Sequence, residues 1–483
     1  IPEKTFQAFG VGAILVVFVA VLAATTLLPA LIGILGDKID SFHVPKSMTI
    51  ILYVIGFLFI AITQELGPKL LFVSAIVMVS LILLSFLRTK GWTLKIFENK
   101  NTSNNSEKGF WNWITIQVMK RPYISMFIAA GFLIILAYFY FDLEKGTSGI
   151  SVLPDDEPVK IGFSLLDEKF GFGSDAPAVI VLDADISSEP IVNALNRLEA
   201  NLSNDKGFLK PDINLLPSVN FAELNSKIPG DPQNQKSLNS IKRLRNEMIP
   251  DAFKDVPSSS YTIYVGGTSA QVVDSVQLTD DYFPIVVGLV LSLSLILLLL
   301  AFRSITISIA SIIMNLLSVG ASYGLLVLVF QKGFMIGVFG FEQVEQLEFW
   351  LPLFMFSILF GLSMDYHVFM LSRIKENYDE TQSADNSVAF GLRKTASIIT
   401  GAALIMVAVF GGFALGEIAF FQSMGFGLGA AVLIDATVVR SILVPSIMKL
   451  LGSKAWYLPK WLNWIPNISI EGNRTKINTK TND

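Results

Sequence analysis

Long apolar runs separated by short polar loops dominate the chain. A helix needs about 20 apolar residues to cross the hydrocarbon core of a bilayer, and the hydropathy pattern offers nine candidate spans. They lie at residues 9–32, 48–63, 70–88, 122–141, 283–302, 305–330, 351–371, 396–416 and 420–449. The second and third are the weakest, and they are predicted to form a thin hairpin or a re-entrant pair. The pattern therefore predicts an α-helical polytopic membrane protein.

One stretch, residues 142–281, interrupts this pattern and is long enough for a folded domain outside the membrane. Its hydrophobic periodicity alternates between the helical and the strand repeat. The helix after Gly267 is expected to continue into the span that begins at 283, which would couple the domain mechanically to the membrane bundle. The order of elements is typical of a ferredoxin-like α/β sandwich. We expect helices at 157–170, 188–203 and 234–248 and strands at 178–183, 213–220 and 261–265.

Composition supports a membrane protein and argues against several other classes. Apolar residues make up 52% of the chain and charged residues 16%, and the mean hydropathy is +0.58. The net charge of −4 argues against a nucleic-acid partner. The chain has no cysteine and only two histidines, His43 and His367, which excludes disulfides and argues against a metal site. Residues 230–237 lack the second glycine of a phosphate loop and no Gly-x-Ser-x-Gly motif occurs, so an enzyme is the least favoured class.

The distribution of lysine and arginine predicts the orientation in the membrane. The loops at 88–121 and 372–395 are basic, whereas the loop at 331–350 is acidic. Basic loops face the cytoplasm, so the start of this chain and the domain at 142–281 are predicted to lie outside the cell (plasma or inner) membrane. Tryptophans after residue 452 predict an interfacial collar that leads into a cytoplasmic tail.

Two parts of the chain resemble each other. Phe6-Gln-Ala-Phe-Gly10 matches Phe421-Gln-Ser-Met-Gly425, and Leu28-Pro-Ala-Leu31 matches Val444-Pro-Ser-Ile447 after a one-residue shift. Duplicated halves are common in secondary transporters, so about 300 residues of a first repeat are expected to be missing upstream. The predicted organisation is 1–36, the last span of that truncated repeat; 37–119, a linker with the apolar hairpin (48–88) and a basic cytoplasmic loop; 120–141, a span; 142–281, the outer domain; 282–451, a five-helix bundle; and 452–483, the collar and tail.

Asp365 is the leading candidate for function because it lies within the predicted span 351–371. A charged carboxylate at this depth costs about 2.5–3.5 kcal/mol on insertion scales, and such groups often mark ion or proton routes. The alternative is a structural hydrogen bond between two helices. Tyr366 points about 100° away on an ideal helix, so each side chain is expected to reach a different neighbouring helix. For His367, a packing or interfacial contact is favoured over a proton-relay role.

Polar and small residues recur along single faces of three spans, where they indicate either a lined polar route or packing seams. The last span adds Asp435, a second functional candidate, and Arg440. These two are five residues apart, so a direct pair is not expected, and Arg440 is interpreted as structural or as extending toward the interface. The secondary site candidates are thus Asp435, Arg440, Asn315, Ser318 and His367. The three faces consist of Ser311, Asn315, Ser318 and Ser322; of Ser357, Gly361 and Asp365; and of Ser397, Gly401, Ala408 and Gly412.

Several of these stretches resemble one known family. Gly361-Leu-Ser-Met-Asp-Tyr-His-Val-Phe-Met-Leu-Ser-Arg-Ile-Lys-Glu376 resembles the tenth-helix signature of the MMPL (mycobacterial membrane protein large) branch of the RND transporter superfamily. Asn315-Leu-Leu-Ser-Val-Gly-Ala-Ser-Tyr-Gly324 is similar to its ninth helix, and Asp435 to Gly452 to its last helix. Ser151-Val-Leu-Pro-Asp-Asp156 is similar to the start of its second porter domain. The resemblance covers most of 1–36 and 120–470.

The resemblance implies an RND-type bundle of twelve spans, two extracytoplasmic porter domains, and proton-driven export of lipids or other hydrophobic compounds. It implies that Asp365 and Tyr366 relay protons with a second Asp-Tyr pair in the missing N-terminal half. Protons are then the coupling ion and no cofactor is implied. The implied partners are the lipid substrate, membrane lipids and the missing half, and homo-oligomerisation stays open. Two features depart from the family pattern: His367 stands where an acid is expected, and the hairpin at 48–88 has no counterpart.

Two other functional classes stay open. A sterol-sensing-like lipid sensor or regulator is an alternative because such proteins share this bundle. A protein-translocation accessory subunit is the other, although the Asp365-Tyr366 flanks and the last helix argue against it. Dependence of the phenotype on a proton gradient would favour transport over sensing.

Overall fold

The computed structural model describes residues 4–36, 110–147, 149–150, 153, 157–170 and 176–466. Seven helices in this described part are long and apolar enough to span a membrane, and they coincide with seven of the nine predicted spans. The predicted hairpin at 48–88 lies outside the described residues. The chain is therefore a multi-pass α-helical membrane protein. The seven are Phe6–Leu35, Pro122–Asp142, Thr268–Phe302, Ile305–Gln331, Leu351–Thr381, Ala384–Ala414 and Ala419–Trp456.

The chain divides into two compact units, Ile1–Ser106 and Glu107–Asp483. The described part of the first unit is one span, built from α1 (Lys4–Leu22), the π-helical segment η1 (Ala23–Leu27) and α2 (Leu28–Leu35). The last span of the chain has the same succession: α16 (Ala419–Ile434), the π-helical segment η10 (Asp435–Leu443) and α17 (Val444–Leu451).

The two spans also share local details. In each, a proline opens the final helix, and the helix ends at a glycine with positive φ, 48° at Gly36 and 55° at Gly452. Proline has no N–H and its ring collides with the carbonyl four residues earlier, so a wider π turn before it relieves the clash. The common geometry supports the internal repeat seen in the sequence.

The membrane bundle of the second unit has an inner and an outer set of helices. The spans of α12, α14 and α16 are half or more buried, at 61%, 50% and 67% of their most apolar windows, whereas those of α6, α11 and α15 are at most 17% buried. Polar groups on the bundle-facing sides of the inner set are therefore shielded by protein. The helical segments are α5 (Phe110–Lys120), α6 (Pro122–Tyr138), η3 (Phe139–Asp142), α11 (Thr268–Phe302), α12 (Ile305–Leu326), η9 (Val327–Gln331), α13 (Ile336–Phe339), α14 (Leu351–Thr381), α15 (Ala384–Ala414), η11 (Gly452–Trp456) and η12 (Lys460–Leu462).

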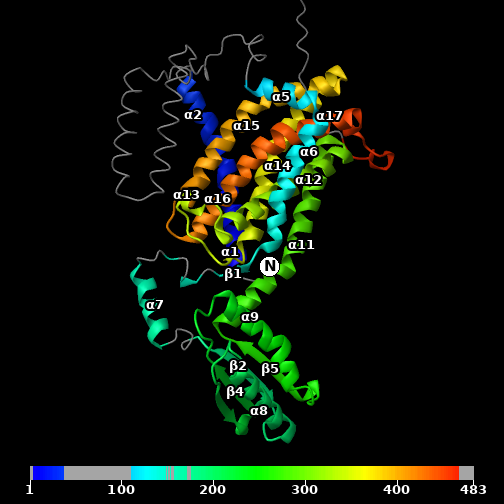
Figure 1. Ribbon diagram of the computed structural model, residues 1–483. Helices are drawn as coiled ribbons and strands as arrows, with labels where there is room; N and C mark the ends of the chain where they lie inside the picture. Colours follow the sequence, from blue (N-terminus) through cyan, green and yellow to red (C-terminus); the bar gives the residue numbers. More distant parts are fainter. Residues whose placement is uncertain are drawn as a thin grey trace, which may run out of the picture. The chain divides into compact units, whose positions relative to one another are not determined.

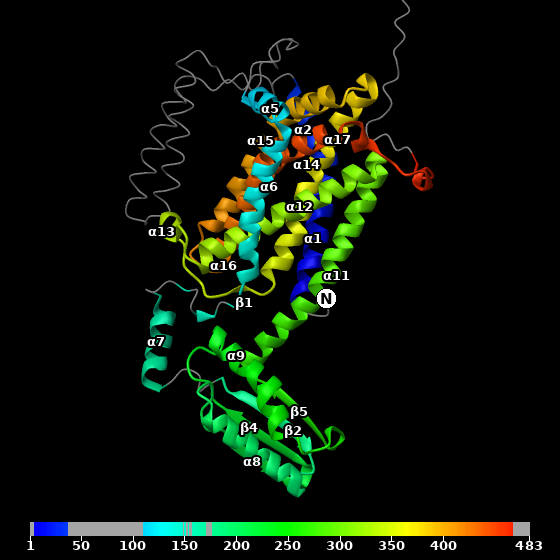
Figure 2. The same cartoon turned by 45° about the vertical axis from the view of Figure 1, so that its right-hand side comes forward.

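Helices α6 and α12 lie side by side in both views (Figure 1, Figure 2) because glycine lets their backbones approach. A Cβ atom at Gly324 of α12 would overlap the Leu136 carbonyl oxygen of α6, and it would lie 3.4 Å from the Ala137 Cα. One turn earlier, a Cβ at Gly320 would meet only the Ala137 methyl, at 3.3 Å. The Gly320-x-x-x-Gly324 pair is thus a packing seam, as small residues at this spacing often are in membranes.

The mutation Gly324→Ala is expected to destabilise the bundle, because the obstacle is backbone and can yield only if α6 shifts. Overpacking of this kind costs about 1–3 kcal/mol. Thermal unfolding of the purified protein in detergent measures the loss. Gly288→Ala in α11 is the matched control, since a Cβ there meets no atom within 4 Å. Equal unfolding midpoints for the two variants would contradict the close approach of α6 and α12.

The outer domain forms a four-stranded antiparallel sheet with the order β3-β4-β2-β5. This is the strand order of a ferredoxin-like domain, which confirms the predicted fold type, although only three strands were predicted. The single strand predicted at 213–220 is wrong. Pro217 cannot donate to a ladder and ends β3, and Asn220 takes a left-handed conformation (φ 54°) that reverses the chain into β4. The strands are β2 (Ala178–Ala184), β3 (Asp212–Leu216), β4 (Phe221–Ser226) and β5 (Tyr261–Gly266), with η6 (Pro217–Val219) and η8 (Ser258–Ser260) between them.

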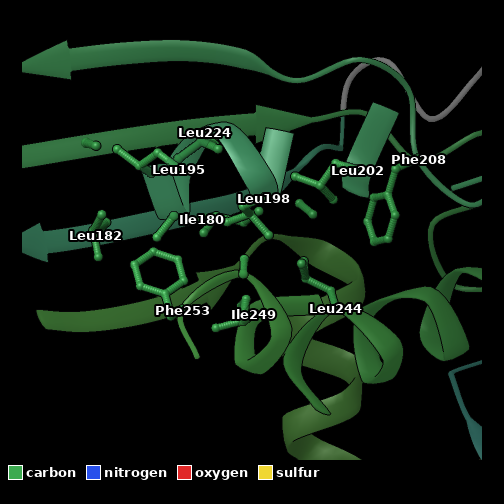
Figure 3. Close-up of a cluster of buried hydrophobic side chains, with 14 of the residues drawn as sticks. Ile180, Leu182, Leu195, Leu198, Leu202, Phe208, Leu224, Leu244, Ile249 and Phe253 are labelled. Atoms are coloured by element: carbon green, nitrogen blue, oxygen red, sulfur yellow. The ribbon is translucent and has the colours of Figure 1, made fainter. Parts of the chain in front are cut away.

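One face of the sheet carries the core of this domain. In β2, alternate residues are buried, as period-two strands with one covered face require. Figure 3 shows the side chains that fill this face: Ile180 and Leu224 from the sheet meet Leu198 of α8 and Phe253 at the end of α10. The helices of the domain are α7 (Pro158–Phe170), α8 (Glu189–Asn204), α9 (Gln235–Arg243), the π-helical η7 (Leu244–Met248) and α10 (Ile249–Ala252).

Helix α11 belongs to both the outer domain and the bundle. It runs without a break from Thr268 to Phe302 (Figure 1), as the sequence predicts. Its first turns pack Ala270 and Val273 into the outer-domain core, and its last turns pack Leu298 and Phe302 into the bundle core. A two-residue parallel ladder of β1 (Lys145–Gly146) with β6 (Leu347–Glu348) makes a second link close by.

Candidate functional site

A buried ion pair lies in the last span, between Asp435 and Arg440 of η10. The Arg440 Nε and Nη2 atoms donate to the Asp435 Oδ2 atom at 2.8 Å and 2.6 Å. The side chains are only 10% and 1% exposed. The prediction that these residues do not pair is therefore wrong, and Arg440 does not extend to the interface.

The π-helical geometry of η10 explains the error. On an α-helix, at 100° per residue, positions five apart lie about 140° apart around the axis. A π-helix closes hydrogen bonds from i to i+5, so residue i+5 lies about one turn above residue i. Asp435 and Arg440 stand at the start and the middle of the π segment, which brings them onto one face. Short π segments are frequent at functional sites.

Ser363 of α14 extends the pair into a network that crosses three helices. Its Oγ atom lies 2.9 Å from the Asp435 Oδ1 atom and 2.9 Å from the Asn315 Oδ1 atom of α12. Its backbone carbonyl accepts a hydrogen bond from Arg440 Nη2. A hydroxyl has one hydrogen, so it donates to one of the two acceptors at a time. Sequence reasoning missed Ser363, although it stands two residues before Asp365 inside the motif.

Asp365 and Tyr366 point in different directions, as predicted. Tyr366 faces inward: the Arg440 Cζ atom lies 4.9 Å from its ring centroid, and its hydroxyl donates to the Met406 Sδ atom of α15 at 3.4 Å. Asp365 is exposed, and its side chain makes no hydrogen bond or ion pair with the described residues. The expectation that it reaches a neighbouring helix is not met within the described residues.

His367 is fully buried and binds across to α12. Its Nε2 atom lies 2.8 Å from the Ser311 Oγ atom. This agrees with the packing contact that the sequence analysis favours over a proton-relay role. All four polar residues predicted on one face of the 305–330 span are buried: Ser311, Asn315, Ser318 and Ser322.

A small cavity of about 20 Å³ lies at the centre of these residues, between Asn315 and Ser318 on α12, Tyr366 on α14 and Asp435 on the last span. That volume holds about one water molecule. The Asn315 Nδ2 and Arg440 Nη1 atoms are buried and make no hydrogen bond to the described residues. No group of three His, Asp or Glu side chains that suits a metal ion occurs in the described part of the chain.

The two other predicted faces of small residues are exposed. Ser357, Gly361 and Asp365 of α14 form one, and Ser397, Gly401, Ala408 and Gly412 of α15 form the other. A Cβ atom at Gly361, Gly401 or Gly412 would meet no atom within 4 Å. These faces therefore do not pack within the described residues, and Asp365 lies on one of them.

Comparison with known proteins assigns the family. Residues 221–465 match the profile described as MMPL family. The chain is 31% identical over 77% of its length to the mycolic acid-containing lipids exporter MmpL11 of Mycolicibacterium smegmatis, covering 39% of that protein. It is 29% identical over 95% of its length to the trehalose monomycolate exporter MmpL3 of Mycobacterium tuberculosis, covering 46%. Against the membrane protein YdfJ of Bacillus subtilis the identity is 28% over 97% of the chain, covering 56%.

The chain thus spans about half the length of the curated relatives it matches. Its motif around Asp365 and Tyr366, its antiparallel outer domain and its seven candidate spans agree with that assignment. The chain belongs to the MMPL family of membrane transport proteins, in the RND superfamily.

Proposed function

We propose that this chain is part of a secondary transporter, not an enzyme, which uses a proton gradient to export lipids or other hydrophobic compounds. The observation that carries the proposal is Asp365, an ionisable carboxyl group within a span that has no counter-charge bonded to it among the described residues. An intramembrane carboxylate is expensive unless it has a function or a partner. Two relatives are named as exporters of mycolic acid-containing lipids and of trehalose monomycolate, which supports a lipid as the cargo class.

The balance of charges supports Asp365 as the group that gains and loses the proton. Arg440 is already neutralised by Asp435 through two hydrogen bonds. With Asp365 ionised, the three groups carry a net charge of about −1; with Asp365 protonated, the net charge is zero. Because a net charge within the bilayer is costly, the site gains one proton when it is cut off from water and releases it when water returns.

Tyr366 and the cavity connect Asp365 to the hydrogen-bonded network around Asp435 and Arg440. Tyr366 lies next to Asp365 in the chain and against the Arg440 guanidinium. Loss of the charge on Asp365 changes the field at Arg440, whose bonds hold α14 to the last span through Ser363. Protonation thus alters the contact between these two helices, which is the step that would drive the outer domain.

We further propose that the exposed faces of α14 and α15 are covered by the remainder of the complete protein. The lengths of the relatives support this, because each is more than twice as long as the matched region. Covering Asp365 in this way would shield it from lipid and bring it near a second Asp-Tyr pair. The basic loops then face the cytoplasm and residues 142–281 lie outside, in agreement with the positive-inside rule.

Collapse of the proton gradient is expected to stop export in a direct test. Vesicles containing the complete gene product and a fluorescent trehalose monomycolate are energised by acidifying the side that holds the outer domain. Transfer of the lipid between leaflets should follow the gradient and fall to the protein-free rate when a protonophore is added. A lipid sensor would bind the probe without moving it. Transfer that continues unchanged after the gradient is dissipated would refute the proposal.

A further inference from the structure

Three separate segments of the chain meet at the side-chain amide of Gln346, in the outer loop between η9 and α14. Its Nε2 atom donates to the Thr147 carbonyl oxygen and to the Gln233 carbonyl oxygen, each at 2.5 Å. Thr147 lies in the segment that follows α6 and η3, and Gln233 belongs to the outer domain. Gln346 is only 5% exposed. A buried amide that uses both hydrogens on backbone carbonyls is a specific connection and not a solvated loop side chain.

On the outer-domain side, the turn that carries Gln233 is held to the domain core by a hydrogen bond to α11. Gln233 lies in the turn before α9, and its neighbour Pro232 accepts a hydrogen bond from Ser269 in the first turn of α11, at 2.5 Å. Ser269 is buried, and the next residue, Ala270, packs in the outer-domain core. A displacement of the Gln233 carbonyl is therefore expected to displace the whole outer domain.

The bundle side runs through a second buried glutamine, Gln422 in α16. Its Oε1 atom accepts a hydrogen bond from the Glu342 backbone N–H at 2.9 Å, four residues before Gln346 in the same loop. Its Nε2 atom donates to the Gly416 carbonyl at 2.8 Å. Gln422 stands in the same continuous span as Asp435, about 20 Å away at 1.5 Å of rise per residue. Because the backbone between the two residues is helical throughout, a displacement of Asp435 along the span is expected to displace Gln422 as well.

From this continuous set of contacts we infer that Gln346 is a positioning residue. It couples movement of the last span, which carries Asp435 and Arg440, to movement of the outer domain. The order of contacts is α16, the Gln422 amide, the loop at 331–350, the Gln346 amide, and then the carbonyls of Thr147 and Gln233. The inference rests on the proposed function for its driving step, and it adds the route by which that step leaves the membrane.

Gly146 offers a second way to break the same connection without touching Gln346. A Cβ atom at Gly146 would overlap the end of the Gln346 side chain and lie 2.7 Å from its Nε2 atom. Gly146→Ala therefore forces the amide away from its two carbonyls. Gly337→Ala, in α13 of the same loop, is the matched control, because a Cβ there meets no atom within 4 Å.

Spin labels measure whether the outer domain follows the bundle. This chain has no cysteine, so Val219→Cys in the outer domain and Ile135→Cys on α6 introduce one pair of labels at two well-exposed positions. Any cysteine in the remainder of the complete protein is replaced by serine. In the complete gene product, the distance between the labels is expected to shift when the pH is lowered. The shift should be retained in Gly337→Ala and lost in Gln346→Ala and Gly146→Ala. Export should fall in the last two by about 5- to 150-fold, the usual range for coupling between two sites.

The outcomes separate this inference from the proposed function. If Gln346→Ala and Gly146→Ala keep the full pH-dependent shift and full export, the inference is wrong whatever drives the transporter. If Asp365→Asn also keeps the shift, the proton step fails and the proposed function fails with it. Unfolding midpoints close to those of the unsubstituted protein in Gln346→Ala and Gly146→Ala are required, since a purely structural role would lower them together with export.

Discussion

Replacement of Arg440 by methionine is expected to be among the most damaging single changes in the chain. Arg440 is almost completely buried and neutralises Asp435. Without it, Asp435 keeps only the Ser363 hydroxyl as a partner among the described residues. Breaking a buried ion pair from one side typically costs about 3–5 kcal/mol, because an uncompensated charge stays in the interior. The unfolding midpoint of the purified complete protein should fall accordingly, and export should be lost.

The double mutant Asp435→Leu, Arg440→Met separates stability from function. Replacing both partners of a buried pair by apolar residues of similar volume is often neutral or stabilising. The double mutant is therefore expected to recover most of the stability lost in Arg440→Met and to stay inactive. An Arg440→Met protein as stable as the unsubstituted one would show that Arg440 does not stabilise Asp435. Export by the double mutant would show that transport does not need the ion pair.

The sequence predicts the architecture well because the bilayer restricts what an apolar run can do. Only helices can satisfy their own backbone hydrogen bonds in lipid, so length and hydropathy located all seven spans in the described part of the chain. The outer domain was recognisable because its helices and strands bury side chains at different, characteristic spacings. Where prediction failed there, at residues 213–220, one proline and one asparagine turned a long strand into a hairpin.

The candidate site was predictable only in part, because part of its geometry departs from the ideal α-helix. Asp365 was proposed from its depth in the membrane, and both Asp365 and Tyr366 from family resemblance; their role stays a prediction. The pair of Asp435 and Arg440 was misjudged because an α-helical wheel places them apart, and only the π turn unites them. Neither buried glutamine was a site candidate, although Gln422 lies in the repeat motif, because the contacts of Gln346 and Gln422 join segments far apart in the chain.

The two copies of the repeated span share a backbone feature but differ in the charges they carry. The first copy has the same α–π–α succession and the same proline, but it carries no ionisable residue between Thr5 and Gly36. Its π segment therefore forms without a charge pair, next to the proline and with the Thr25 and Thr26 hydroxyls bonded to carbonyls of the preceding turn. In the second copy the same widened turn brings Asp435 and Arg440 together. The backbone feature is common to both copies, and the charge pair is a property of the second.

The mutation Asp365→Asn is expected to abolish proton-coupled export without destabilising the protein. Asparagine has nearly the same shape but stays neutral, so the site is held in its protonated charge state. Because an intramembrane carboxylate costs about 2.5–3.5 kcal/mol on insertion scales, the variant should be at least as stable as the unsubstituted protein. Loss of transport at equal or higher stability distinguishes a functional carboxyl group from a structural one. Export is measured in the energised vesicles described above, and stability by thermal unfolding.

Two variants control this experiment. Asp365→Glu keeps a titratable carboxyl group at a slightly different position and should retain part of the activity. Glu376→Gln, near the end of the same helix, removes a carboxylate that pairs with Arg373 at 2.8 Å, and it should leave export unchanged. Both controls matter, because together they show that the effect belongs to proton binding at residue 365 and not to any change of charge on α14. Normal export by a correctly inserted Asp365→Asn protein would mean that proton transfer does not pass through this residue.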